Sequence, residues 1–539
     1  MTTAVRDPMV EPPEPPEPTA PPEELAERTG AWRWWIVLAI TAASAVLHLW
    51  DLGLRPLAHD ESLDAWFSWQ ARDFGVMRYD PVYHGPLRFY LGGFVLDTFG
   101  TSAAWARSVA AVAGIMATAV IAASTRTLGR VGAPVAAVAF TVSPTLLTVT
   151  RTGREDSLVV LVSVGLLLLV ARALTEPRPA QLIGCGVLLA ASFGLKESTF
   201  LFGLNAFLFF VVGGIVALGR PSSRSRAVVD RLRQLGTQPW IWAATAFAVT
   251  FIVIFTSGFR YSAGLESGLL DGLRYWWSQH DVGRGGQPWF FHLAIYGTYE
   301  WLLLGLATVG LVVSVRRRSV VGAWFAAMAI GQTVLYSWAG EKFAWLAAHP
   351  LVPMVLLAGF GAQAVADRLT TVRRRVAVGG GLAVVVLATL VTAIPPAITN
   401  GADPRELLVT VQTSVDVPPV VDELLAAHQE GRIRTIAIDE SGGGSWPWAW
   451  YLNDVSGVDF VRLDPLSLPT DYDALVVLAL GDEPVELDGY TSRRFRFREW
   501  WVPDYDDASV GDVANWWLTR KPWSPTASLD QYLLVRDEG

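Results

Sequence analysis

The sequence is poor in cysteine and in charged residues, and both shortages limit the classes of protein that it can encode. Cys185 is the only cysteine among 539 residues, which excludes a disulfide or a cysteine-based metal site within the chain. Charged residues make up 17% of the chain and hydrophobic residues 52%, with a mean hydropathy of +0.35. A soluble protein averages about 25% charged residues. The composition therefore predicts a polytopic membrane protein with room for a soluble domain.

The sequence also lacks the signals of nucleic-acid and nucleotide binding. No basic stripe is present, and the formal net charge is -8, so we expect no nucleic-acid partner. Segment 441–445 (SGGGS) follows an expected strand but lacks the Gly-Lys-Ser/Thr ending of a phosphate loop, so we interpret it as a flexible loop. We find no cleavable signal peptide and interpret the first apolar segment as an anchor.

Apolar runs of about 20 residues, the length that crosses a bilayer as a helix, predict eleven transmembrane helices. They lie near residues 32–50, 103–124, 131–149, 157–174, 180–195, 199–218, 238–256, 290–314, 320–338, 345–365 and 376–395. The run 87–99 is short and charged, so we expect it to lie in the interface. With eleven spans and a cytoplasmic N-terminus, the arginine clusters, such as 316–318 and 373–375, fall in the cytoplasmic loops.

Three regions follow from this topology. Residues 1–30 are rich in proline and glutamate and should form a disordered cytoplasmic tail. Residues 31–396 form the membrane domain, whose first outer loop is 51–102. Residues 397–539 are more charged and show strand and helix patterns that predict a small α/β domain outside the membrane. Strands are expected at 432–439, 458–462, 472–480 and 531–536, and helices at 420–429 and 512–521.

The long outer loop 257–289 contains an amphipathic pattern over 263–280, in which leucines and tryptophans alternate with charged residues. This pattern predicts a helix that lies in the membrane interface. Such a helix could help to form a groove for a lipid-linked molecule. A lid that only packs over the bundle fits the same pattern.

The polar residues that carry chemistry fall almost entirely on the outer face. The first outer loop holds His59, Asp60, Glu61 and His84, and carboxylates and imidazoles beside a bilayer usually bind or react. The ends of later spans add Arg154, Glu155, Asp156, Lys196, Glu197, Glu341, Lys342 and His349. We predict that these groups converge on one active site, and that Asp60, Asp156, Lys196 and Lys342 surround a cavity open to lipid. Outer loops that are merely polar, with Asp60 as a helix N-cap, are the alternative.

The order of these features resembles that of the GT-C superfamily of polyprenyl-phosphate-sugar-dependent glycosyltransferases, which includes the protein O-mannosyltransferases. The first span is followed by His59-Asp60-Glu61, a tryptophan-rich helix, the stretch RYDPVYHGPLRFY at 78–90 and then Ala106-Arg107-Ser108. With the segment EKFAWLAAHPLVP at 341–353, these features are most similar to the archaeal and bacterial flippase-activity-associated proteins of N-glycosylation. The resemblance covers residues 30–395 and implies a GT-C-like membrane fold.

The resemblance also implies roles for the outer residues. Asp60, with Glu61 beside it, would act as a general base on an acceptor hydroxyl that attacks the anomeric carbon with inversion. Arg154, Lys196, Lys342 and His84 would bind the donor phosphate. His59, Glu155, Asp156, Glu197, Glu341 and His349 would contact the acceptor or sugar or hold a metal. A divalent ion such as Mg or Mn at Asp60 and Asp156 is left open.

The partners implied are a polyprenyl-phosphate (dolichyl-phosphate) hexose donor, the bilayer, and a glycan, lipid or protein acceptor. Two other functions stay open. The first is a transporter, flippase or flippase-associated factor for lipid-linked sugars, which should show broken helices and internal repeats; we find no convincing repeat. The second is a non-catalytic scaffold that holds a glycan through its outer domain.

Overall fold

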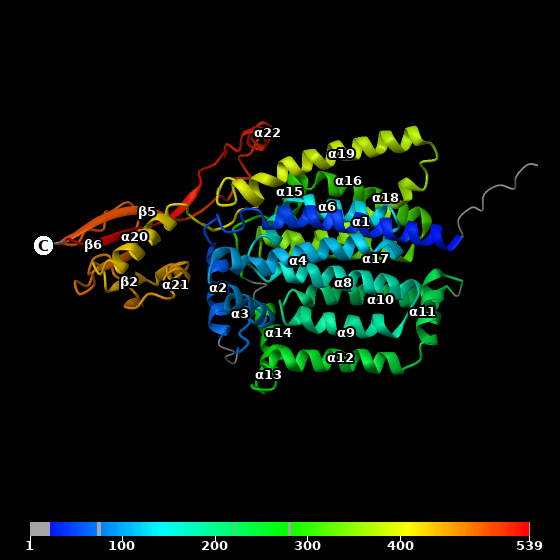
Figure 1. Ribbon diagram of the computed structural model, residues 1–539, viewed down its shortest axis with the longest axis horizontal. Helices are drawn as coiled ribbons and strands as arrows, with labels where there is room; N and C mark the ends of the chain where they lie inside the picture. The colour runs from blue at the N-terminus through cyan, green and yellow to red at the C-terminus, as the bar shows by residue number, and fades with distance from the viewer. Residues whose placement is uncertain (1–21, 73–76, 221, 279–281, 538–539) are drawn as a thin grey trace, which may run out of the picture.

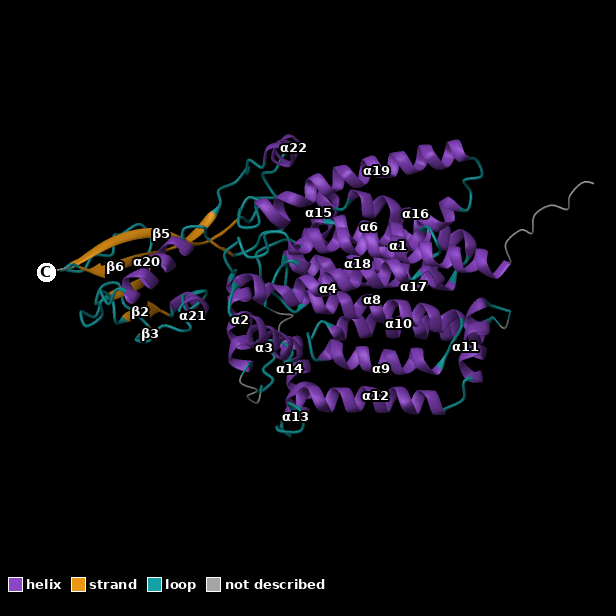
Figure 2. Ribbon diagram, in the orientation of Figure 1, coloured by secondary structure: helices purple, strands orange, loops and turns teal. Residues whose placement is uncertain are grey.

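The structure, a computed structural model, describes residues 22–72, 77–220, 222–278 and 282–537. A long bundle of helices carries at one end a smaller part that contains a sheet (Figure 1). Figure 2 shows the strands confined to this smaller part. Helices α2 (His59–Ala71) and α3 (Leu87–Phe99) lie at the same end of the bundle, and the arginine-rich α11 (Arg224–Gln234) lies at the other. The acidic first loop and an arginine-rich segment thus occupy opposite ends.

Seven helices of the described part are long and apolar enough to cross a membrane, and two bent pairs raise this number to nine. The seven are α4 (Ala103–Ala123), α8 (Asp156–Thr175), α10 (Thr199–Gly219), α12 (Gln238–Phe255), α17 (Val320–Trp338), α18 (Ala348–Ala366) with its preceding turn, and α19 (Val372–Ile394) with its following turn. The bent pairs are α6 (Gly132–Val142) with α7 (Pro144–Thr150), and α15 (Phe291–Tyr299) with α16 (Trp301–Arg317).

The two remaining predicted spans are also apolar helices, but they are shorter. They are the segment Arg33–Leu49 of α1 (Pro22–Leu49), and α9 (Pro179–Phe193), which has 15 residues. The polytopic helical fold is therefore as predicted, while the number eleven stays a prediction. Helix α1 begins inside the segment 1–30 that we expected to be disordered, because Pro22 at its first position and the following glutamates favour a helix N-terminus. Residues 1–21 lie outside the described residues.

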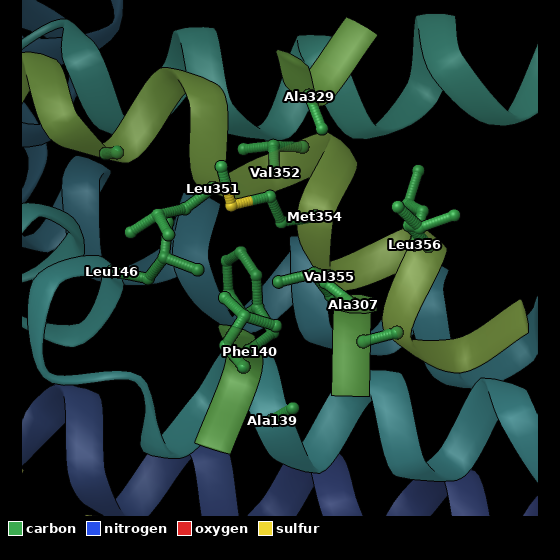
Figure 3. Packing of buried hydrophobic residues seen from close by; sticks show 14 of the residues in the cluster. Ala139, Phe140, Leu146, Ala307, Ala329, Leu351, Val352, Met354, Val355 and Leu356 are labelled. Carbon is green, nitrogen blue, oxygen red and sulfur yellow. The ribbon is translucent and has the colours of Figure 1, made fainter. Parts of the chain in front are cut away.

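The bundle core is built around α18. In the most apolar stretch of α18 and its preceding turn, 89% of the residues are buried. Figure 3 shows Phe140 of α6 packed among Leu146, Met354 and Val355. Glycines allow the closest helix contacts: a Cβ on Gly310 would lie 2.1 Å from the carbonyl oxygen of Leu357. Small residues at such crossings let backbones approach, which is a common basis of helix packing within membranes.

The two bends of the bundle meet at Glu300, a buried carboxylate at the break between α15 and α16. Its Oε1 accepts hydrogen bonds from Ser143 Oγ at 2.8 Å and from the backbone nitrogen of Thr145 at 2.9 Å. Ser143 is the break between α6 and α7, and the pairs bend by 68° and 101°. The Glu300 carboxylate at one bend therefore accepts hydrogen bonds from donors at the other bend, which have no acceptor within their own helix.

Replacing Glu300 by Ala should lower the free energy of unfolding by about 1–3 kcal/mol, because the buried donors of Ser143 and Thr145 lose their acceptor. Replacing it by Gln should cost less, since an amide oxygen still accepts these bonds. Thermal unfolding of both variants in detergent measures the difference. Equal midpoints for wild type and Glu300→Ala would contradict the assignment.

The smaller part contains a six-stranded sheet with the order β1-β5-β6-β4-β2-β3. The strands are β1 (Gln412–Thr413), β2 (Ile436–Asp439), β3 (Val458–Val461), β4 (Ala474–Leu478), β5 (Tyr490–Trp500) and β6 (Ala527–Arg536). β2 pairs in parallel with β3 and β4, and the other pairs are antiparallel. The helices are α20 (Val417–Gln429), α21 (Trp448–Tyr451) and α22 (Val510–Thr519). Four of these strands and two of these helices coincide with the segments expected from the sequence. The position of this smaller part outside the membrane stays a prediction.

The long outer loop is helical over residues 264–278, through α13 (Gly264–Glu266), a π-helical turn (Ser267–Asp271) and α14 (Gly272–Ser278). The rest of the predicted segment, 279–281, lies outside the described residues. Leu269 and Leu273 are exposed on this helix, as an interfacial helix requires.

Candidate functional site

Two neighbouring cavities lie at the end of the bundle that carries α2, and some residues line both of them. The larger has a volume of about 480 Å³ and the smaller about 300 Å³. Both are lined by His59, Asp60, Arg154, Phe343 and Trp345. Asp60, which the sequence singled out, therefore lies where a group in either cavity can reach it.

Asp60 occupies the first turn of α2 and is paired with Arg154. The N-cap of α2 is Ala58, so the alternative that Asp60 caps the helix is wrong. Arg154 Nη1 donates a hydrogen bond to Asp60 Oδ2, while 41% of the Asp60 side chain stays exposed. Burial raises the pKa of Asp60, but the charge of Arg154 outweighs it and the net pKa lies below the usual value. Asp60 is thus a carboxylate that is held in place and still accessible.

Glu61, predicted to be catalytic beside Asp60, is fully occupied by other contacts. Its oxygens accept hydrogen bonds from Arg107 Nε and Nη2 at 2.8 Å, Arg55 Nη2 at 2.9 Å, and the backbone nitrogens of Gly153 and Ala58 at 2.7 and 3.0 Å. A carboxylate offers about four acceptor positions, so none is left for a substrate. Burial raises the pKa of Glu61, but Arg107 and Arg55 hold it far below the usual value. The geometry therefore gives Glu61 a structural role in fixing the start of α2.

A buried network of ion pairs lies behind Arg154. Lys196 Nζ donates to Glu155 Oε1 and Asp156 Oδ1, both at 2.7 Å, and His349 Nε2 lies 2.9 Å from Asp156 Oδ1. Burial lowers the pKa of Lys196, but the charges of Asp156 and Glu155 raise it well above the usual value. Asp156 and His349 thus hold Lys196 in place and do not line either cavity in the described part of the chain.

His84 joins this network to the motif at 78–90. His84 Nδ1 lies 2.7 Å from Glu197 Oε2, and the hydroxyl of Tyr79 donates to Glu197 Oε1 at 2.5 Å. His84 Nε2 lies 3.5 Å from Glu155 Oε1. Burial lowers the pKa of His84, but Glu155 and Glu197 outweigh it and raise the pKa to about 9. His84 is therefore a cation at neutral pH and lines the larger cavity.

Two predicted assignments do not match the geometry. Lys342 donates a hydrogen bond to the carbonyl oxygen of Ala339 and, within the described residues, is absent from the walls of both cavities. Asp60 and Asp156 do not fit a divalent ion, because Arg154 lies between them, with its Nε 3.4 Å from Asp156 Oδ2. No group of three or more His, Cys, Asp or Glu among the described residues is arranged to hold a metal. Glu341, in contrast, does line the larger cavity.

Two arginines that sequence reasoning missed also line the cavities. Arg284 is exposed at the larger cavity, and its guanidinium has no hydrogen bond or ion pair with any residue that the structure describes. Arg498 of β5 lines the smaller cavity and donates to the carbonyl oxygens of Gly443 and Trp446 at 2.5 and 2.9 Å. No sequence pattern marks either arginine as a site residue, because the position of each at its cavity depends on how distant segments of the chain fold together.

Asp64 is a third residue that the sequence did not single out for the site, although its spacing places it one helical turn beyond Asp60 on the same face of α2. It lines the larger cavity, is 5% exposed, and its Oδ2 has no hydrogen-bond partner among the described residues. Burial, followed by the nearby charge of Glu155, raises the pKa of Asp64 to about 8. A neutral carboxyl of this kind can donate a hydrogen bond into the cavity.

The raised pKa of Asp64 predicts a pH-dependent stability. Between pH 3.8 and about 8 the folded protein keeps a proton on Asp64 that the unfolded chain releases. The free energy of unfolding should therefore fall as the pH rises through this window, and it should fall less steeply in Asp64→Asn. His84 adds a loss of the same sign in both proteins, so the difference between them isolates Asp64. Thermal unfolding of both proteins across this range tests this, and parallel curves would contradict it.

The chain resembles known proteins both in a segment of its sequence and in its fold. Residues 83–221 match the family model of dolichyl-phosphate-mannose-protein mannosyltransferases. ArnT from Cupriavidus metallidurans bound to undecaprenyl phosphate aligns with a TM-score of 0.55 at 16% identity, over 79% of this chain and 85% of ArnT. The Archaeoglobus fulgidus oligosaccharyltransferase in complex with Zn and sulfate aligns with a TM-score of 0.51 at 12% identity, over 82% and 67%. A search of curated proteins gave no match.

These matches identify the fold of the chain. The chain has the GT-C fold of membrane glycosyltransferases, and the predicted resemblance to that superfamily is confirmed. Its segment 83–221, which contains His84, Arg154 and Lys196, matches the mannosyltransferase family model in particular. The narrower resemblance to flippase-activity-associated proteins is not supported by these matches and stays a prediction.

Proposed function

We propose that this protein is a glycosyltransferase that moves a sugar, a hexose, from a polyprenyl-phosphate donor to an acceptor on the extracytoplasmic face of the membrane. The observation that carries the proposal is the position of Asp60, which lines two cavities at once and is held there by Arg154. A transferase needs two substrates to meet at one base, and this arrangement provides such a place.

The larger cavity suits the donor. Its wall includes the cations His84 and Arg284, which can stabilise a phosphate as negative charge grows on it. Tyr336, Trp345 and Trp446 supply aromatic surface for a sugar or prenyl chain. Lys196 also lines this cavity, but its charge is already balanced by Glu155 and Asp156, so His84 and Arg284 contribute more.

The smaller cavity suits the acceptor. Its wall includes Thr145, Thr148, Thr152 and Gln412, whose side chains can hydrogen-bond a hydroxylated ligand, and Arg498. An acceptor hydroxyl placed between the cavities would attack the anomeric carbon while Asp60 takes its proton. The bond between this carbon and the phosphate oxygen breaks, the polyprenyl phosphate leaves with the electron pair, and the configuration inverts. The residues do not fit a divalent ion at Asp60 and Asp156, and no step of this mechanism uses one.

A transporter for lipid-linked sugars is the second candidate, and the two bent helix pairs are the feature that favours it. In this chain, however, the two breaks are bonded to each other, because Glu300 at one break accepts hydrogen bonds from Ser143 and Thr145 at the other. A transporter also has no need of a base shared by two cavities.

The test is a transfer assay with the purified chain in liposomes, using a synthetic polyprenyl-phosphate mannose with labelled mannose as the probe and a membrane extract as the source of acceptors. We expect label to appear on an acceptor only when the folded protein is present. Labelled donor that crosses the liposome membrane without any transfer would support the transporter instead.

A further inference from the structure

Helix α22 exposes an apolar face that the rest of the described chain covers only in part. Val510 and Leu518 are 89% and 75% exposed, and Val513 and Trp517 are 42% and 41% exposed. Their spacing places these four side chains on one side of a helix. An apolar face of this kind on a surface helix usually marks contact with a membrane or a partner.

The opposite face of α22 packs against residues of the region that follows the last membrane helix. Trp516 is 1% exposed, its Nε1 donates to the carbonyl oxygen of Arg405 at 2.9 Å, and its ring packs against those of Trp501 and Trp523. Arg520 Nε, just after the helix, donates to Glu406 Oε1 at 2.8 Å. The exposed face therefore has a defined orientation relative to the bundle.

The position of α22 points to the lipid surface. Trp517 Nε1 donates to the carbonyl oxygen of Thr298 in α15, the first half of a bent span, at 3.2 Å. Figure 1 shows α22 on one flank of the bundle and α13 and α14 on the other, at the same level along its long axis. The helical segment 264–278 also exposes apolar side chains, among them Leu269 and Trp277.

We infer that α22 lies in the lipid–water interface, with Val510, Val513, Trp517 and Leu518 inserted among the lipids, and that it fastens the sheet-containing part to the membrane surface. Lipid is favoured over a second copy of the chain or a soluble protein, because the face lies beside a bundle of predicted membrane spans. A tryptophan whose indole nitrogen is bonded and whose ring is exposed is typical of this depth.

The single native cysteine makes a direct test practical. In a Cys185→Ser background, cysteines introduced by Val510→Cys, Leu518→Cys and Asn515→Cys are labelled with an environment-sensitive fluorophore. Asn515 is the matched control, since it is exposed on the same helix but lies outside the apolar face. Each protein is reconstituted, one copy per nanodisc, with lipids that carry a nitroxide quencher near the headgroup.

We expect the labels at positions 510 and 518 to be quenched at least about twofold more strongly than the label at 515, because an interfacial helix buries only one face about 5–10 Å deep. Equal quenching at the three positions would overturn the inference. Quenching that is weak at 510 and 518 in single-copy nanodiscs, with labels that are shielded only at high protein concentration, would also overturn it in favour of a second copy. These results do not depend on whether sugar transfer occurs.

Discussion

Asp60→Asn should lower the rate of sugar transfer by about 10²–10⁴-fold, the usual contribution of a general base. Asparagine has the shape of aspartate and still accepts a hydrogen bond from Arg154, but it cannot take the proton of an acceptor hydroxyl. Because Asp60 is part-exposed and Arg154 keeps its contact with Glu155 at 3.2 Å, the fold should be little affected. The rate is measured in the transfer assay at saturating donor, together with the thermal midpoint of each protein.

The matched control for this experiment is Asp97→Asn, which makes the same change at an exposed position of α3, away from both cavities. Its rate should equal that of wild type. Equal turnover in Asp60→Asn and Asp97→Asn would remove the assignment of Asp60 as the base. A loss of rate in Asp60→Asn with an unchanged midpoint would support it, since misfolding could not explain the result.

The largest effect on stability should come from Glu61. Glu61→Gln should lower the free energy of unfolding by about 3–5 kcal/mol, because it leaves the buried charges of Arg107 and Arg55 without their carboxylate. Both Arg107 and Glu61 are 1% exposed, so water cannot replace the lost partner. Thermal or denaturant unfolding in detergent measures the loss.

Two further variants separate this mechanism from general sensitivity to mutation. Glu486→Gln, on an exposed loop, should change the free energy by no more than about 0.5 kcal/mol. Adding Arg107→Met to Glu61→Gln should cost less than the sum of the two single changes, because the second removes a charge that the first left unpaired. If the losses in free energy of unfolding were strictly additive, Glu61 and Arg107 would not interact, and the prediction would be wrong.

The sequence predicted the helices well because a lipid-facing segment must be apolar over its whole length. All eleven predicted segments coincide with apolar helices, and Asp60, His84 and Arg154, which were predicted to converge, line the same cavity. It could not predict which charges neutralise each other. Glu61 meets Arg107 from 46 residues away, and Lys196 meets Asp156 from 40 residues away, so these pairings depend on the tertiary fold.

The sheet-containing part was harder to predict for a related reason. β5 alternates arginine with phenylalanine (RRFRFREW), and the pattern gives no sign that Arg498 is buried while Arg496 is exposed. The register of β5 against β6 shifts between Arg496 and Arg498, and the Arg498 guanidinium then bonds the carbonyl oxygens of Gly443 and Trp446. The raised pKa of Asp64 likewise depends on its burial and then on the charge of Glu155, neither of which the sequence of α2 alone shows.

The walls of both cavities have one structural consequence. Gly443 and Trp446 complete the larger cavity, and Gln412 and Arg498 complete the smaller one, although all four follow the last membrane helix. A chain shortened at residue 396 would keep every predicted span and Asp60, yet it would lack these four residues of the cavity walls. The predicted membrane domain alone therefore leaves both cavities incomplete.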